Sequence, residues 1–256
     1  MKDKLHLVQN LLEKRSARKK EGKFVVEGPH LVEALLRSPG ASENRFDFVI
    51  YSKNSPLLEK LKGIDCYKVS PKQFADISEV ESPQGILAVV REKKYGLKDV
   101  LGGLIVFCAG VQDPGNLGTI IRTADAVGAS GIILSKGTVD LYNSKVIRSS
   151  MGSIFHLPIV PVDDIAETVK ALKSKHIKIV AADINGEKDY FLVEYKEPTA
   201  ILVGNEGAGL AAEVVKLADE VVKIPMPGKA ESLNVGISTA VVLYEALRQR
   251  EYAGKN

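Results

Sequence analysis

The amino-acid sequence predicts an α/β fold in two parts: a small N-terminal domain and a larger domain built on a parallel sheet. Strand-like and helix-like segments alternate along the chain, which is typical of α/β proteins. From residue 104 the strand-like segments are near-continuous apolar runs, as parallel strands covered on both faces are. The charged stretch REKKYGLKD (91–99), interrupted by Gly96, separates the two parts. We therefore expect domains over 1–92 and 101–256, joined by a linker over 93–100.

The N-terminal part begins with a predicted amphipathic helix over 3–20, whose apolar side carries Leu5, Val8, Leu11 and Leu12. The strands expected here are KFVVEG (23–28), RFDFVIY (45–51), DCYKVS (65–70) and QGILAVV (84–90). The helices expected between them are PHLVEALLRS (29–38), PLLEKLKG (56–63) and PKQFADIS (71–78). Each of these helices has proline near its first turn, where the missing N–H costs nothing.

The C-terminal part continues the alternation. Its expected strands are LIVFCAG (104–110), GIILS (131–135), LPIV (157–160), IKIVAAD (177–183), TAILVG (199–204) and VVKIP (221–225). Helices are expected up to Val127, from about Asn143, over 163–174, over 207–218 and at the end of the chain. The last helix has Ser232 at the predicted N-cap. Its predicted apolar face consists of residues at helical spacing, namely Ile237, Ala240, Val241, Tyr244 and Leu247.

Composition sets the class of protein. The chain has 256 residues, 45% of them hydrophobic and 26% charged, so it can bury a sizeable core. No apolar run approaches the roughly 18 residues of a membrane span, and the basic N-terminus lacks the apolar core of a secretory signal. Cys66 and Cys108 lie far apart without metal-ligand spacing. We expect reduced core thiols, a cytoplasmic protein and no metal site.

Positive charge is concentrated at the N-terminus. Residues 1–24 hold eight Lys or Arg and three acids, an excess of +5, whereas the whole chain carries only +3. A basic segment on a near-neutral body indicates a polyanionic partner, RNA or DNA. A solvated helix face is the alternative interpretation of the same charges.

Three motifs in the C-terminal part stand where strands run into helices. The first, VQDPGNLGTIIRTADA (111–126), places Asn116 at a helix mouth and Arg122 six residues further on. Alone, this motif is better explained as a Pro-Gly turn followed by a surface arginine. The second, ILVGNEGAGL (201–210), has glycines in the order G-x-x-G-x-G, which is not the G-x-G-x-x-G of dinucleotide-binding folds. Its Glu206 could simply be a helix N-terminal acid.

The third motif, IPMPGKAESLNVGISTA (224–240), joins a short strand to the last helix. Pro225 and Pro227 stiffen the turn. Gly236, Ser238 and Thr239 are small enough to admit a ligand or another backbone. A rigid turn at a helix start suits an anionic or polar small molecule, although a buried strand–helix unit would have a similar pattern.

Together and in this order, the three motifs resemble those of the SpoU (TrmH-like) branch of the SPOUT RNA 2'-O-ribose methyltransferases, over roughly residues 105–250. Arg15-Ser16-Ala17-Arg18 followed by FVVEGPHLVEALL resembles the L30e-like substrate-binding domain that many of these enzymes carry. The resemblance implies S-adenosylmethionine as the cofactor, a deep trefoil knot in the C-terminal domain, and a homodimer with the site built between protomers.

The resemblance also implies roles for single residues. The implied catalytic residues are Asn116, Arg122, Glu206, Ser232 and Asn234. The implied cofactor-binding residues are Val203, Gly204, Asn205, Gly207, Ile224, Pro225, Met226, Ser232, Leu233, Asn234 and Val235. The expected RNA contacts are Arg15, Arg18, Lys19 and Lys20, with Arg148 and Ser150 from KVIRSSMGS (145–153), a segment that is equally a plain helix surface.

The implied reaction moves a methyl group to a ribose 2'-hydroxyl. The motifs contain no His, Cys or isolated Asp that would serve as an ordinary base. Because arginine has a pKa above about 12, we expect Arg122 to stabilise the alkoxide and a neighbouring phosphate; whether it also takes the proton stays open. The N-terminal domain favours 23S rRNA as the substrate. The alternatives are a transfer RNA methyltransferase, a non-catalytic RNA-binding protein, and a nicotinamide-dependent enzyme, which the glycine order disfavours.

Overall fold

The computed structural model describes residues 1–38 and 45–252, and the chain divides into two compact units. The first comprises Met1–Lys94 and Asp140–His156, and the second comprises Tyr95–Val139 and Leu157–Asn256. The predicted limits at 1–92, 93–100 and 101–256 stay a prediction. One segment lies elsewhere than expected, because 140–156 belongs to the first unit although the prediction assigned it to the C-terminal domain.

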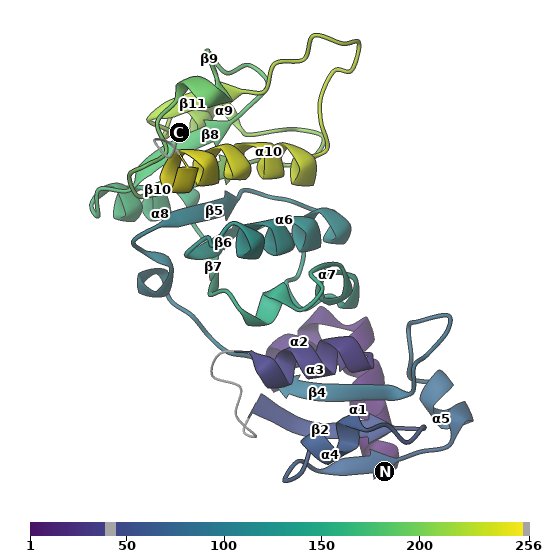
Figure 1. The fold of residues 1–256 in the computed structure, drawn as a ribbon. Helices are drawn as coiled ribbons and strands as arrows, with labels where there is room; N and C mark the ends of the chain where they lie inside the picture. The colour runs from purple at the N-terminus through teal and green to yellow at the C-terminus, as the bar shows by residue number, and fades with distance from the viewer. Residues whose placement is uncertain (39–44, 253–256) are drawn as a thin grey trace. The chain divides into compact units, whose positions relative to one another are not determined.

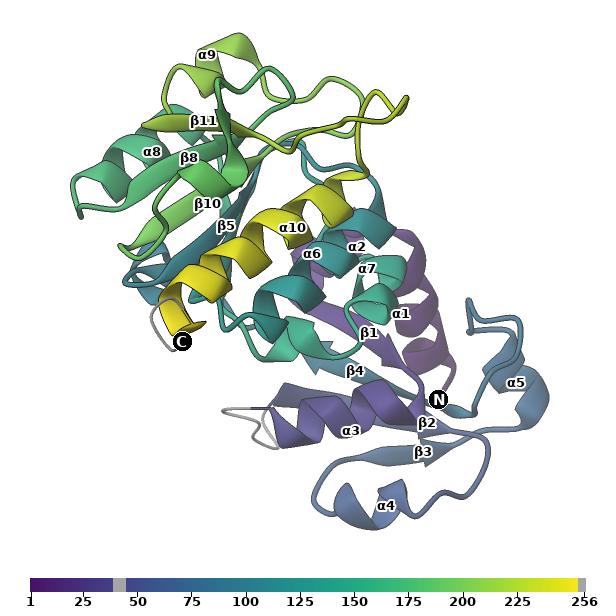
Figure 2. The ribbon, with the colours of Figure 1, turned by 45° about the horizontal axis from the view of Figure 1, so that its top comes forward.

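The first unit is built on a mixed sheet with the strand order β1-β4-β2-β3 (Figure 1 and Figure 2). Strand β4 is antiparallel to β1 and to β2, whereas β2 and β3 are parallel. The strands are β1 (Lys23–Glu27), β2 (Phe46–Tyr51), β3 (Cys66–Lys68) and β4 (Ile86–Arg91). The helices before residue 90 are α1 (Lys2–Glu13), α2 (Arg15–Glu21), α3 (Pro29–Arg37), α4 (Leu57–Lys60) and α5 (Pro71–Ala75). The predicted apolar side of the first helix packs on this sheet, with Val8 and Leu11 buried against Phe48 and Leu87.

The helix predicted over 3–20 is interrupted at Lys14, whose backbone is extended (φ −117°, ψ 113°). The break leaves carbonyl groups at the end of α1 without helical partners. Arg18 of α2 satisfies two of them, donating from Nη1 to the carbonyls of Leu11 (2.6 Å) and Leu12 (2.9 Å). The side chain of Arg18 is therefore a capping group, which explains why a charged residue in this basic segment is only 5% exposed.

The segment 140–156 packs into the first unit through side chains at its start. Asp140 accepts from Arg18 Nη2 at 2.6 Å and from Nε at 2.7 Å. The ring of Tyr142 stacks on Phe24, with centroids 4.3 Å apart. Helix α7 (Ser144–Ser149) and a 3₁₀ turn (Ser153–Phe155) follow. Since Phe24 is a core residue of β1, this segment forms part of the N-terminal hydrophobic interior.

The second unit has a wholly parallel sheet in the order β7-β6-β5-β10-β8-β11-β9, which confirms the predicted parallel architecture. Its strands are β5 (Leu104–Cys108), β6 (Gly131–Ser135), β7 (Ile159–Val162), β8 (Lys178–Ala182), β9 (Lys188–Asp189), β10 (Thr199–Val203) and β11 (Glu220–Lys223). Its helices include α6 (Pro114–Ala126), α8 (Ile165–Lys173), α9 (Ala212–Val215) and α10 (Val235–Leu247). Ile105, Phe107, Ile133 and Leu202 are wholly buried in its core. The implied knot stays a prediction.

Helix α10 packs beside α6 (Figure 2), and it is apolar on two sides. The buried side consists of Gly236, Thr239, Val242, Leu243 and Ala246. The predicted apolar face lies on the other side, where Ile237 is 51% and Tyr244 is 54% exposed. The periodicity identified a real stripe, and the structure shows that this stripe is not the side of the helix that packs into the unit. Beyond α10, the chain is held by Arg250, which donates to the carbonyls of Tyr195 and Glu197.

The helix predicted over 207–218 is only Ala212–Val215, and it is preceded by a tight turn. Asn205 and Gly209 form both hydrogen bonds of an antiparallel bridge, each 3.0 Å long. The side chain of Asn205 also accepts from the amides of Gly207 and Ala208. Gly209 closes this turn with a left-handed backbone (φ 65°), which cannot lie inside an α-helix and so explains the late start. Within 1–38 and 45–252, no helix is long and apolar enough to cross a membrane.

We expect Arg18→Ala to destabilise the first unit by about 3–5 kcal/mol, the usual loss when one partner of a buried ion pair is removed. The variant leaves Asp140 and two helix-end carbonyls unsatisfied. Urea unfolding followed by far-UV circular dichroism measures the loss. Arg15→Ala is the matched control, because Arg15 is exposed on the same helix, and equal stability of the two variants would contradict the capping role.

Candidate active site

The three predicted motifs meet at one edge of the parallel sheet. Strands β5 and β10 are neighbours, with Cys108 opposite Val203, and β8 and β11 follow on the far side of β10. The loops after neighbouring parallel strands emerge at the same edge, where open α/β sheets bind ligands. This topology explains why segments about a hundred residues apart in sequence form one site.

Asn116 is positioned by the start of α6. The helix begins at Pro114, and the side chain of Asp113 caps it by accepting from the Asn116 amide at 2.9 Å. Proline supplies the fixed φ suited to the first helical position. The cap therefore places Asn116 in the first turn, with its side chain at the edge of the sheet.

Glu206 joins the second motif to the first. Its Oε2 accepts from the amide of Gln112 at 3.0 Å, and its Oε1 accepts from the amide of Asp113 at 2.9 Å. Oε1 also accepts from Nδ2 of Asn116 at 3.0 Å. One carboxylate thus holds the loop ahead of α6 and orients the side chain at the helix start.

Asn234 joins the third motif to the other two. Its Nδ2 donates to Oδ1 of Asn116 at 2.8 Å. Its Oδ1 caps α10, accepting from the amides of Gly236 (2.9 Å) and Ile237 (3.3 Å). The N-cap is therefore Asn234 and not Ser232 as predicted, because the Asn234 amide oxygen takes the first free amides of the helix. Each amide orientation is fixed by its neighbour, so the three side chains form one directed network.

The charge of Glu206 follows from these contacts. Partial burial acts to raise the pKa of the carboxyl group, but the hydrogen bonds from Asn116, Gln112 and Asp113 outweigh it and hold the pKa below its ordinary value. Hydrogen bonds donated to the charged form favour that form. Glu206 is therefore an acceptor near neutral pH and not a proton donor.

Two glycines make the close approach of these loops possible. A Cβ on Gly204 would lie 2.4 Å from the backbone carbon of Gly209, and one on Gly236 would lie 3.1 Å from Cγ2 of Thr119 on α6. A contact of 2.4 Å is closer than any real Cβ tolerates, so Gly204 is required by the turn after β10. Gly236 lets the start of α10 lie close against α6 and brings Asn234 to Asn116.

Arg122 extends from the third turn of α6 into solvent. It is exposed, and it makes no hydrogen bond or ion pair with any residue in the described part of the chain. Surface arginines of this chain commonly have an acidic partner, as Arg37 and Arg248 do. A guanidinium without such a partner is available to an anionic ligand.

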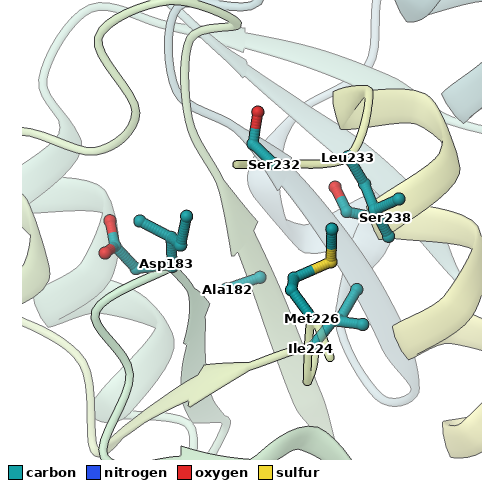
Figure 3. A pocket seen from close by; sticks show the side chains of 8 residues that line it. Ala182, Asp183, Ile224, Met226, Ser232, Leu233 and Ser238 are labelled. Carbon is teal, nitrogen blue, oxygen red and sulfur yellow. The ribbon is translucent and has the colours of Figure 1, made fainter. Parts of the chain in front are cut away.

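A pocket of about 470 Å³, including space open to solvent, is lined in part by Ser232 and Leu233, the residues just before Asn234 (Figure 3). Ile224 and Met226, after β11, and Leu233 and Ser238, around the start of α10, lie on one side of it, with Asp183 on the other. The remaining lining residues are Ala182, Ile184 and Ser232. An apolar wall with a few polar groups is the usual lining of a small-molecule site.

The pocket fits the adenosine half of S-adenosylmethionine: Ile224, Met226 and Leu233 offer apolar surface to a purine, and Ser232 and Asp183 offer polar groups to hydroxyls. Four of the predicted cofactor residues therefore line it: Ile224, Met226, Ser232 and Leu233. The others lie in the adjoining backbone: Val203, Gly204, Asn205, Gly207, Pro225, Asn234 and Val235. The cofactor-binding role of all these residues stays a prediction. Sequence reasoning missed Ala182, Asp183, Ile184 and Ser238. The position of 182–184 at the carboxyl end of a predicted parallel strand was the available signal.

Cys108 takes no part in the chemistry. It ends β5 just ahead of the first motif, is wholly buried, and burial followed by the charge of Glu206 raises its pKa to about 12. The thiol stays protonated and inaccessible. Among residues 1–38 and 45–252, no group of three or more His, Cys, Asp or Glu could hold a metal ion.

The predicted RNA contacts separate into two groups, all within the first unit. Arg15, Lys19 and Lys20 are exposed on α2, and Arg148 is half-buried, 3.9 Å from Glu79. The other two are placed against the expectation. Arg18 is buried as a capping residue, and Ser150 is wholly buried with its hydroxyl donating to the Ile147 carbonyl at 2.9 Å. Neither side chain can reach RNA without unfolding its surroundings.

Comparison with known proteins agrees with this geometry. Residues 103–244 match the model of the SpoU rRNA Methylase family, and residues 2–88 match that of the MRM3-like substrate binding domain. The chain is 37% identical over 234 residues to the 23S rRNA (guanosine(2553)-2'-O)-methyltransferase RlmP of Bacillus subtilis, covering 91% of this chain and 92% of that protein.

Solved structures agree as well. The SpoU methyltransferase AviRb from Streptomyces viridochromogenes, in complex with the cofactor AdoMet, superposes with a TM-score of 0.88 at 32% identity, covering 97% of this chain and 98% of that one. The AdoMet-bound rRNA methyltransferase from Sinorhizobium meliloti gives 0.85 at 32% identity, with 95% and 94% covered.

Fold and site together define an α/β methyltransferase with an N-terminal substrate-binding domain. The chain belongs to the SpoU rRNA methylase family. Membership of this family argues against the alternative of a nicotinamide-dependent enzyme.

We expect Glu206→Gln to destabilise the second unit in a pH-dependent way. Because the folded-state pKa of Glu206 lies below 4.5, its stabilising contribution is complete above about pH 4.5 and is lost as pH falls through the lowered folded-state value. Glutamine has an oxygen at only one of the two positions, so the amide of Gln112 or of Asp113 would face an NH₂ group in place of an acceptor. Urea midpoints at pH 7, 5 and 4 measure the effect.

The difference between wild type and Glu206→Gln should be largest at pH 7 and smallest at pH 4. Glu231→Gln, at an exposed carboxylate without a hydrogen bond in the described part of the chain, is the control. A difference that stays constant with pH would show that the carboxylate charge is not what holds the loops.

Proposed function

We propose that this protein transfers a methyl group from S-adenosylmethionine to a ribose 2'-hydroxyl of 23S ribosomal RNA. The observation that carries the proposal is the network of Glu206, Asn116 and Asn234, which unites the three loops beside a pocket suited to the cofactor. Arg122 on the same helix as Asn116 supplies a cation that no described acid neutralises.

When bound, S-adenosylmethionine supplies a methyl group already activated by its sulfonium, so the protein mainly has to position the reactants. Ile224, Met226 and Leu233 hold the adenosine on the apolar wall, and the predicted backbone contacts at 203–207 and 225–235 lie beside them. Expulsion of water by these apolar side chains favours a reaction in which charge is lost, as it is between a sulfonium and an alkoxide.

Asn116, Ser232 and Asn234 position the nucleotide. Nδ2 of Asn116 donates to Glu206 and its Oδ1 accepts from Asn234, so its amide is already oriented. Ser232 lines the pocket and makes no hydrogen bond with the described residues, which leaves its hydroxyl for the substrate. A site whose donors and acceptors are fixed in advance needs no reorganisation during the reaction.

Arg122 stabilises the developing alkoxide and the adjoining phosphate. A guanidinium keeps its positive charge near neutral pH and can bind a phosphate with two parallel hydrogen bonds. Its free side chain gives it the reach to do so from the exposed side of α6. The charge of Arg122 favours the deprotonated 2'-oxygen whichever group accepts the proton.

The choice of ribosomal RNA rests on the relatives and on the first unit. The Bacillus subtilis relative is named for guanosine and the Streptomyces viridochromogenes relative for uridine, both in 23S rRNA. They cover 91% and 94% of this chain, whereas a solved transfer RNA-modifying relative from A. aeolicus covers 61%. The exposed Arg15, Lys19 and Lys20, with Arg148, form the proposed RNA-contacting surface of the first unit.

We also propose a cytoplasmic homodimer. Both cysteines are free thiols, as expected in a reducing compartment. The exposed stripe of α10, with Ile237 and Tyr244 about half in solvent, offers an apolar surface that a second copy would cover.

The first experiment incubates the protein with methyl-labelled S-adenosylmethionine and unmodified transcripts of 23S rRNA, 16S rRNA and transfer RNA in parallel. We expect label in 23S rRNA, recovered as alkali-resistant dinucleotides because a 2'-O-methyl group blocks cleavage. Label only in transfer RNA would preserve the chemistry and overturn the substrate. No label in free RNA or in ribosomal particles would favour a non-catalytic RNA-binding protein.

In the same assay, Arg122→Ala should lower kcat by about 100-fold or more, the usual effect of removing one group that stabilises charge in a transition state. Cofactor affinity, measured by calorimetry, should stay within about twofold of wild type, because Arg122 does not line the pocket. Arg122→Lys keeps the charge without the planar fork and should be intermediate. Turnover of Arg122→Ala equal to wild type would refute the assignment.

For the dimer, we expect Tyr244→Arg to give monomers in sedimentation velocity at micromolar concentration, because it places a charge in the apolar stripe. Tyr244 is 54% exposed, so the variant should fold normally. Leu192→Arg, at another exposed apolar residue outside α10, is the control. A wild-type protein that already sediments as a monomer would contradict the proposal.

A further inference from the structure

Met151 has a backbone conformation and an environment that do not suit its side chain. Its φ is +52°, in the left-handed region, yet its side chain is 48% exposed. In that region Cβ lies too close to the following carbonyl oxygen, so glycine or asparagine is preferred. Burial would be the usual reason to keep a large apolar residue there, and Met151 has little of it.

The conformation itself is required, because it ends α7. The amide of Met151 donates to the Arg148 carbonyl at 3.2 Å, and Ser150 occupies the C-cap. Left-handed residues commonly end helices, with glycine favoured. Among the described non-glycine residues, only His176, at the end of α8, has a positive φ as well. Histidine is several-fold enriched in this region, whereas methionine has no such preference.

The surroundings leave the backbone at Met151 little freedom. The hydroxyl of the buried Ser150 donates to the Ile147 carbonyl, and the amide of Ser153 donates to the Ser150 carbonyl at 3.0 Å. A Cβ on Gly152 would lie 2.8 Å from Cβ of Ala34, so the chain is packed tightly there. The backbone on both sides is fixed, so the left-handed conformation is kept although Met151 is about half exposed. Strain of this kind persists at functional positions.

Two cations lie in the segment that contains Met151. The stretch from Leu141 to Val162 contains Lys145 and Arg148 and no acidic residue, and the acids near it in the fold are Glu27 and Glu79. The ion pair of Arg148 with Glu79 is long, at 3.9 Å, and 38% of the arginine side chain is exposed. RNA offers phosphates to such cations and flat apolar base faces to a neighbouring side chain. A thioether is flexible and makes favourable contacts with aromatic rings.

We propose that Met151 is an RNA-contacting residue that packs its thioether against a nucleobase of the substrate and so helps to position it. The inference rests on the proposed function, since it assigns a substrate contact for that reaction. It gives a reason for a methionine where the backbone favours glycine or asparagine.

The test compares Met151→Asn with wild type. Asparagine accepts the left-handed conformation and removes the apolar side chain without changing the charge. We expect KM for the 23S rRNA transcript to rise about threefold to tenfold, the range of a lost sulfur–aromatic contact. The value of kcat and the affinity for S-adenosylmethionine should stay within twofold, and the melting temperature should stay equal or rise. Met151→Leu, which keeps an apolar side chain, should retain most of the RNA affinity.

His176→Asn is the matched control, because it makes the same kind of replacement at the other left-handed position. It should leave KM for RNA unchanged. If Met151→Asn and His176→Asn have the same KM as an active wild type, the inference is wrong while the proposed function stands. If wild type methylates no RNA, the proposed function fails first. A shift of Met151→Asn towards monomers without a change in KM would assign the side chain to a protein contact and overturn the proposal.

Discussion

The carboxylate of Glu206 is the group on which the geometry of the site depends. It accepts from two backbone amides and one side-chain amide, all contributed by the loop and helix that follow β5. Asn116 in turn accepts a hydrogen bond from Asn234, and the side chain of Asn234 caps the start of α10. A side chain with a single acceptor atom could not do this. The hydrogen bonds also keep the carboxylate charged, because they lower its pKa against the effect of burial. The same hydrogen bonds therefore hold the loops together and keep Glu206 charged.

The strands of the fold, apart from the two-residue β9, were predictable because their signals are local. Apolar runs such as LIVFCAG and TAILVG gave β5 and β10 within a residue or two. The failures arose where long-range contacts override local pattern. Nothing in the sequence near Arg18 indicates that its guanidinium satisfies the carbonyls ending α1 and pairs with Asp140, 122 residues away. The helix expected over 207–218 was shortened by the turn that Asn205 and Gly209 close, in which Gly209 has a left-handed backbone.

The site, like the fold, was predicted only in part. The resemblance to SpoU enzymes named Asn116, Glu206 and Asn234, and the structure brings these three into contact, although spacing alone could not have shown it. It did not name Asp183 or Ser238, which line the pocket from β8 and α10. The apolar face of α10 shows a limit of periodicity arguments. A helix with apolar residues on two sides has two faces that could be buried, and its sequence does not distinguish them. Only packing decides which face belongs to the interior.

The first unit is discontinuous in sequence, since residues 140–156 belong to it although they lie between β6 and β7 of the second unit. The backbone therefore passes from one unit to the other at three places and not at one. A C-terminal fragment that begins at Tyr95 would keep 140–156. It would lose Phe24, against which Tyr142 stacks, and Arg18, which pairs with Asp140. The substrate-binding module cannot be exchanged between relatives as a simple N-terminal cassette. A functional chimera has to carry the inserted segment along with the domain that receives it.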